Sequence, residues 1–297
     1  RPHCAWPEDG DGPMKPLKDH PYREFLSDVS MPSRYVGGEY GSASSFGSKT
    51  AAATMALVFP DVYEVGMSHL GTQILYAGIN GEPDLELQRC FPPWASLATQ
   101  LRRRGLPLVS LETATPLSRF DVVGFSLQHE LNFTNVLNCL DLGGVPLRTD
   151  DRGDDDPVVL GGGPMANHPE PMAVFFDAFV VGEAEEVLGP LLREIGAMRR
   201  AGVDRKTFLR RLGNRPGVYV PSLYQVTVDD RSGLQIPRPL ADAPKRVRRV
   251  HPRDLNASPL PAHLILPWNR AVFDRVSMEL ARGCSEGCRF CEAGFTY

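Results

Sequence analysis

Three closely spaced cysteines near the end of the sequence have the side chains best suited to chemistry. Cys284, Cys288 and Cys291 fall within eight residues of the stretch "ARGCSEGCRFCEAGF". A structural zinc site takes four ligands, usually in pairs along the chain, and the nearest further candidate is His263, far upstream. An iron–sulfur cluster is also held by cysteine thiolates, normally four. Three would leave one iron open to a substrate or cofactor.

The spacing Cys-x-x-x-Cys-x-x-Cys, with Phe290 before the last cysteine, resembles the signature of radical S-adenosylmethionine (radical SAM) enzymes. The resemblance implies a 4Fe–4S cluster whose open iron binds S-adenosylmethionine, and an electron donor that drives its cleavage to a 5′-deoxyadenosyl radical. It also implies a strand before the loop, matched by "RVSMEL" at 275–280. The family's later glycine-rich stretch does not occur before Tyr297, so we expect a partial (β/α) barrel truncated just after its start.

The elements that would position this loop follow an α/β pattern. Apolar runs predict strands in "TMALVFP", "LPLVSLE", "DVVGFSL", "PVVLGGGP" and "DAFVVGE". Helical spacing of apolar residues predicts helices in "HLGTQILYAGIN", "WASLATQLRRRG", "LNFTNVLNCLDLGG" and "AEEVLGPLLREIGAMRRAG". Alternation of this kind indicates a flavodoxin- or Rossmann-like parallel sheet with helices on both faces. Ligands bind at the carboxyl ends of the strands in such sheets.

The residues after the predicted strands resemble those of cobalamin-binding domains of the methionine synthase type. Such domains carry Asp-x-His-x-x-Gly after the first strand, where this sequence has Asp61, Tyr63 and Gly66. Because tyrosine replaces the cobalt ligand, the resemblance implies cobalamin bound base-off, with nearby His69 out of register as an alternative ligand. The remaining residues that the resemblance assigns to cofactor binding are Ser126, Gly161, Gly162, Gly163, Gly182 and Glu183. A tight turn explains the glycine run equally well, and Glu183 would also suit a helix N-terminus.

Over residues 33–297 the chain resembles one uncharacterised family of cobalamin-binding radical SAM proteins. The shared stretches include "SRYVGGE", "FPDVYEVGMSHLGTQILY", "FDVVGFSLQHELNFTNVLNCLDLGGVPL" and "GVYVPSLY". The resemblance implies an enzyme that generates the radical, with cobalamin able to deliver a methyl group to an unknown substrate. Two alternatives stay open: non-methylating radical chemistry, and a cobalamin-binding module that is inactive on its own.

Composition places the chain among ordinary globular proteins. It has 297 residues, 42% hydrophobic and 23% charged, with a net charge of −4, so no global positive field attracts it to nucleic acid or membrane. No apolar run approaches the ~20 residues of a membrane helix, and the first residues show no signal-peptide pattern, so we expect a cytoplasmic protein with no membrane partner. Cys4, Cys90 and Cys139 are scattered and predicted to be structural.

Changes in composition and in apolar periodicity along the chain predict four segments. They are an N-terminal extension at 1–50 (1–13 disordered), a cobalamin-binding domain at 51–200, a linker with a helix and a hairpin at 201–270, and the barrel start at 271–297. The hairpin turn is predicted at Asp230 to Gly233. One basic run is a candidate for contact with the phosphates of an RNA substrate, although a solvated linker is the simpler interpretation. The run comprises Lys245, Arg246, Arg248, Arg249 and Arg253.

Overall fold

A six-stranded sheet organises the described part of the chain. The computed structural model describes residues 19–43, 46, 50–240, 243–257, 261–273 and 275–296. The strand order is β2–β1–β3–β4–β5–β6, parallel throughout except for β6, which runs antiparallel to β5. The strands are β1 (Ala53–Val58), β2 (Leu85–Cys90), β3 (Val122–Ser126), β4 (Val158–Gly162), β5 (Ala178–Val180) and β6 (Val218–Tyr219). The first five follow the flavodoxin order, so the predicted α/β fold is confirmed.

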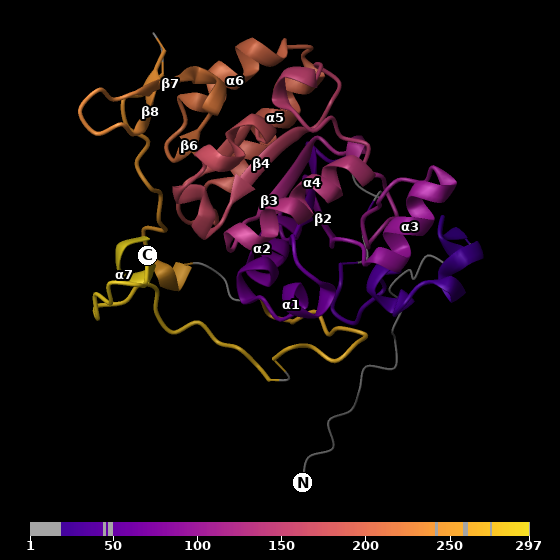
Figure 1. The fold of residues 1–297 in the computed structure, drawn as a ribbon. Coiled ribbons are helices and arrows are strands. Elements are labelled where there is room, and N and C mark those ends of the chain that lie inside the picture. Colours follow the sequence, from indigo (N-terminus) through magenta and orange to yellow (C-terminus); the bar gives the residue numbers. More distant parts are fainter. Residues whose placement is uncertain are drawn as a thin grey trace.

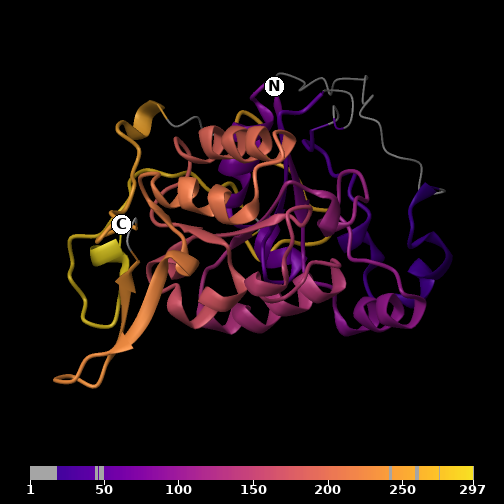
Figure 2. The ribbon, with the colours of Figure 1, turned by 90° about the horizontal axis from the view of Figure 1, so that it is seen from above.

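Helices cover both faces of this sheet, as expected (Figure 2). α3 (Ala95–Arg104) and α4 (Phe133–Leu142) pack on one face. α2 (Leu70–Asn80), α5 (Leu188–Arg200) and α6 (Arg205–Gly213) pack on the other, while the short α1 (Tyr63–Met67) follows β1 (Figure 1). Alternate residues of each buried strand therefore enter two separate cores. No helix in the described part of the chain is long and apolar enough to cross a membrane.

Helix α3 has the apolar face and the C-terminal glycine that the sequence predicts. Leu97 and Leu101 are buried, whereas the arginines of its last turn are exposed. The helix stops at Gly105, whose φ of 64° lies in the left-handed region that glycine adopts without strain. An apolar face and a C-terminal glycine were sufficient to predict both the helix and its end.

Two predicted strands are not formed. "LPLVSLE" contributes only an isolated bridge from Val109 to Pro116, because its backbone turns back at Ala114, where φ is 51°. "RVSMEL" at 275–280 pairs with no strand among the described residues, and Val276, Met278 and Leu280 are 75%, 70% and 87% exposed. A strand requires neighbours for its backbone groups, so apolar alternation alone was misleading in both places.

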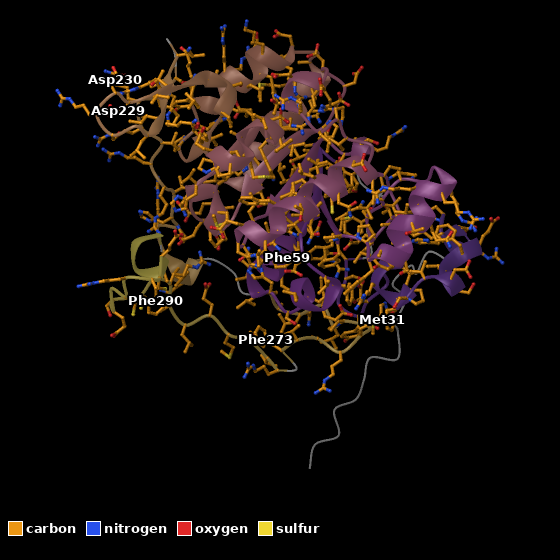
Figure 3. The ribbon with its side chains drawn as sticks, in the orientation of Figure 1. Met31, Phe59, Asp229, Asp230, Phe273 and Phe290 are labelled. Carbon is orange, nitrogen blue, oxygen red and sulfur yellow. The ribbon has the colours of Figure 1, made fainter. Side chains whose placement is uncertain are left out.

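A separate hairpin and several short helices lie outside the six-stranded sheet. The hairpin of β7 (Tyr224–Val228) and β8 (Gln235–Pro239) forms its own two-stranded sheet, with Asp229 and Asp230 at its tip (Figure 3). Gly233, at a φ of 69°, lies in the predicted turn. Short 3₁₀ helices occupy Arg23–Asp28, Pro32–Tyr35, Leu117–Arg119, Glu130–Asn132, Thr149–Asp151, Pro164–Asn167, Glu170–Phe175, Pro221–Leu223 and Leu255–Ala257, and α7 spans Ala293–Thr296.

The division of the chain into four segments remains a prediction. The extension contributes Tyr22 and Phe25 to the core on the α3 and α4 face. Beyond the 200/201 boundary, α6 packs on the sheet and β6 joins it. Cys4 and the disorder predicted for 1–13 lie outside the described residues.

Candidate functional site

A groove of about 390 Å³ lies at the carboxyl ends of the parallel strands. Residues that follow β3, β4 and β5 line it, together with the start of α2 and residues 279–283, which precede the first clustered cysteine. The residues assigned from sequence that line it are Ser126, Gly163, Gly182 and Glu183, with His69 among them. The topology therefore brings these residues beside the cysteine loop, 284–291.

Polar contacts on both flanks hold the cysteine loop against the α/β domain. Before the loop, Arg282 Nη2 lies 2.6 Å from Glu185 Oε1, and its Nη1 lies 3.4 Å from Glu183 Oε2. Arg282 also pairs with Glu279 at 2.7 Å, and hydrogen bonding to Glu279 raises the arginine pKa. After the loop, His168 Nε2 lies 3.0 Å from Glu292 Oε1. Loops following β4 and β5 thus anchor the two ends of the cysteine segment.

The three loop cysteines are accessible thiols. Cys284 and Cys288 are exposed and Cys291 is half-buried. Their donor set suits a soft metal or an iron–sulfur cluster. Within the described ranges, no group of three His, Cys, Asp or Glu side chains is arranged to hold a metal ion. Phe290 is 92% exposed and projects from this loop (Figure 3).

The other two described cysteines are of a different kind. Cys90 and Cys139 are buried in the core on the α3 and α4 face. Burial raises the pKa of both thiols, so they stay protonated. A protonated, buried thiol is not a metal ligand, so among the cysteines that the structure describes only those of the loop remain candidates.

Tyr63 and Gly66 face the interior and not the groove. The Tyr63 hydroxyl donates to Glu39 Oε1 at 2.9 Å and accepts from the Trp268 backbone N–H at 3.1 Å. Burial and the nearby Glu39 carboxylate raise the Tyr63 pKa, so the phenol stays neutral. A Cβ on Gly66 would lie 2.2 Å from the Phe91 ring, so close packing alone requires glycine there. In this structure neither residue is placed to contact a ligand at the strand ends.

Asp61 and His69 occupy opposite ends of the first connection. Asp61 Oδ2 accepts from Asn132 Nδ2 at 3.3 Å and lies 3.8 Å from His129 Nε2. His69 instead caps α2 by accepting from the Thr72 backbone N–H at 3.1 Å, and burial lowers its pKa. His129 was not singled out from sequence, although it lies in the "SLQHE" stretch that follows a predicted strand.

Ser126 and the glycine run border a second, smaller cavity of about 50 Å³. Gly161 is glycine because its Cβ would lie 2.4 Å from the Phe179 ring, and Gly163 has a φ of 87° with its Cβ position 2.7 Å from Leu127 O. Of the three glycines in this run, Gly162 alone has open space beside its α-carbon. The cavity has room for one or two waters at ~30 Å³ each. It would have to widen to accept the nucleotide tail of cobalamin.

Gly182 and Glu183 contact the linker. A Cβ on Gly182 would lie 2.1 Å from Val250 O, and its φ is 106°. The Glu183 backbone N–H donates to Val250 O at 3.0 Å. The close approach of the linker explains the glycine, and the Glu183 side chain is directed to Arg282.

Comparison with known proteins identifies the class. Residues 71–221, just over half of the chain, match the family described as "Radical SAM proteins, N-terminal", and the chain belongs to that family. Membership implies S-adenosylmethionine and, typically, a 4Fe–4S cluster. An uncharacterized protein of Methanocaldococcus jannaschii is 22% identical over 244 residues, which cover 82% of this chain and 41% of that protein. The chain thus spans about two fifths of the length of this relative. No solved structure matches.

Proposed function

We propose that this protein is a radical SAM iron–sulfur enzyme in which Cys284, Cys288 and Cys291 hold a 4Fe–4S cluster, and that its α/β domain binds cobalamin base-off. The ion pairs of Arg282 support the proposal, because they seat the segment before these cysteines in the groove at the strand ends. When bound, such a cluster supplies the electron that cleaves S-adenosylmethionine to a 5′-deoxyadenosyl radical. An external electron donor must provide that electron.

The protein's own groups have positional roles in this proposal. The loop thiols bind iron, while Arg282 and Glu185 orient the loop toward the groove. Asp61, Ser126 and Gly162 are the strand-end residues left to contact cobalamin, because Tyr63 and Gly66 are engaged in the interior. Methyl transfer to an unreactive carbon of an unknown substrate is the proposed use of cobalamin. Non-methylating radical chemistry and a binding module without turnover are the alternatives.

Iron binding tests the cluster. We expect anaerobic reconstitution with iron and sulfide to load about four irons per chain, and the Cys288→Ala variant to lose most of them. Cys139→Ala is the matched control, since it removes a buried thiol from α4 and should load like the native protein. Equal iron in the native protein and Cys288→Ala would refute the ligand assignment. An electron paramagnetic resonance (EPR) signal that shifts on addition of S-adenosylmethionine would support an open iron.

Cobalamin binding is tested separately. The folded protein is mixed anaerobically with cob(II)alamin, and the EPR spectrum is recorded. A bound signal without nitrogen splitting supports the base-off assignment. Splitting that disappears in His129→Ala, and persists in His69→Ala, would instead identify His129 as the cobalt ligand, backed by Asp61. Absence of binding would remove cobalamin from the proposal and leave the cluster assignment standing.

A further inference from the structure

Positive charge is concentrated in one stretch of this acidic chain. Residues 205–253 contain twelve Lys and Arg side chains against three Asp and Glu, whereas the whole chain has a net charge of −4. A charge asymmetry of this size within one protein points to a polyanionic partner. Radical cleavage of S-adenosylmethionine makes no use of these residues, so they require another explanation.

Part of this charge lines a cavity. Lys206 and Arg210 of α6 line a space of about 560 Å³, together with Leu240 and Ala243 just beyond the hairpin and with Arg205, whose guanidinium is paired with Asp177 at 2.7 Å. Thr149 and Ser222 line the same space with Leu209 and Leu223, and Asp150 adds one carboxylate to the lining. Cations and hydroxyls suit phosphate oxygens and ribose hydroxyls, while apolar side chains suit the face of a base.

The same charge continues along the linker. Lys245, Arg246 and Arg248 are exposed, as are Lys206 and Arg210. None of these five side chains makes an ion pair within the part of the chain that the structure describes. Exposed cations without carboxylate partners keep their full attraction for phosphate, and arginine can bind it through two parallel hydrogen bonds. We call these five residues the basic track.

The basic track leads from the cavity to the groove. Near its start, the Tyr224 hydroxyl donates to Pro244 O at 2.7 Å. At its end, the Val250 backbone N–H donates to Val181 O at 2.9 Å, directly after β5. The chain between these two points spans at most roughly 20 Å when extended. In Figure 1 it descends from the hairpin to the region of α7.

We propose that the basic track binds the phosphates of an RNA strand and presents it to the groove, so that RNA is the substrate class. This inference rests on the proposed function, because the groove is its radical site. Carboxylates at the groove, including Glu185 and Glu279, repel phosphate. The RNA backbone therefore stays on the track, and a base or ribose is the part that reaches the cysteine loop.

The test measures fluorescence anisotropy of a single-stranded RNA oligonucleotide of mixed sequence over a range of KCl concentrations. The variant is Lys245→Gln/Arg246→Gln/Arg248→Gln. We expect its affinity at low salt to fall by about tenfold or more, and the slope of log K against log salt to flatten by about 2, from ~0.7 for each lost phosphate contact. Circular dichroism checks that every variant is folded.

The matched control is Arg102→Gln/Arg103→Gln/Arg104→Gln, which removes the same charge from exposed arginines of α3, on the other face of the sheet. It should bind RNA like the native protein. The proposal is overturned if the folded native protein does not bind, if both variants lose affinity equally, or if polyglutamate competes as well as RNA. Because this assay needs neither cluster nor cobalamin, its outcome is independent of whether iron binds.

Discussion

A buried charge cluster gives the sharpest test of the physical reasoning. Arg89 Nη2 lies 2.8 Å from Glu39 Oε2 and its Nε lies 2.6 Å from Glu112 Oε1. All three side chains are at most 3% exposed. Arg89→Met, a change of similar volume, would remove the cation and leave two carboxyl groups buried without it.

The size of the effect follows from proton uptake. Breaking a buried pair by removing one partner costs about 3–5 kcal/mol. If a glutamate of ordinary pKa near 4.3 is held neutral at pH 7, the cost is ~3.7 kcal/mol, from 1.36 kcal/mol for each pH unit. If both glutamates are held neutral, the loss of unfolding free energy can reach at most about 7 kcal/mol. This loss is comparable with the whole stability of a typical domain, about 5–15 kcal/mol.

The sign of the pH dependence is fixed by the same argument. In the native protein, burial already raises the pKa of Glu112 against the opposing effect of Arg89. Without Arg89, the folded-state pKa of Glu112 rises further above its unfolded value, so the folded variant binds more protons than the unfolded chain. The free energy of unfolding must then fall as pH rises, by about 1.4 kcal/mol per pH unit for each proton held. Stability lost at pH 7 should be regained toward pH 5.

Urea unfolding of Arg89→Met and the native protein at pH 5 and pH 7.5 measures this dependence. Arg102→Met is the exposed control, since its partner Asp141 is equally accessible, and it should stay within about 0.5 kcal/mol. Adding Glu39→Gln and Glu112→Gln to Arg89→Met should abolish the extra pH dependence. An Arg89→Met variant as stable as the native protein at pH 7.5, or one whose deficit does not change with pH, would refute the reasoning.

Two further predictions concern the site. Gly66→Ala should cost about 1–3 kcal/mol of stability through overpacking against Phe91, while leaving the cobalamin affinity of the folded protein unchanged; weaker binding at unchanged stability would favour a direct contact instead. Arg282→Glu should speed amide hydrogen exchange in the stretch 279–292, and Glu185→Arg in the same chain should restore protection. Exchange that does not respond to either change would show that the ion pair does not anchor the loop.

Strands with uniformly apolar sequence could be predicted, and those that depend on distant partners could not. β1 and β3 have the apolar runs of buried parallel strands, so local sequence was sufficient. β2 was missed because "LELQRC" is half polar, yet all six residues are buried. Its Gln88 accepts hydrogen bonds from Ser110 and Thr113, and its Arg89 pairs with residues 23 and 50 positions away. Partners so distant in sequence leave no local signal.

The cysteine loop could be predicted because its signal, unlike that of β2, is entirely local. Its metal-binding chemistry is encoded in the spacing of three residues on one short segment, and no tertiary contact is needed to recognise it. The anchors of the loop were not predictable as anchors. Glu183 was assigned to the cofactor from its position after a strand, and nothing in the sequence links it with Arg282, about a hundred residues later.

The motif correctly predicted that these residues lie at the strand ends, but it did not predict what their side chains contact there. Tyr63, Gly66, Gly161 and Gly182 lie where the resemblance places a cofactor, yet each is accounted for by contacts within the protein. A close-packed interior requires small and aromatic residues at the same strand ends at which ligands bind. Substitutions at these positions therefore disturb packing whether or not cobalamin binds. Ser126 borders both the groove and the second, smaller cavity, and Gly162 borders that smaller cavity with open space beside its α-carbon. Substitutions at these two positions would disturb packing least, so a loss of binding there would report on the ligand itself.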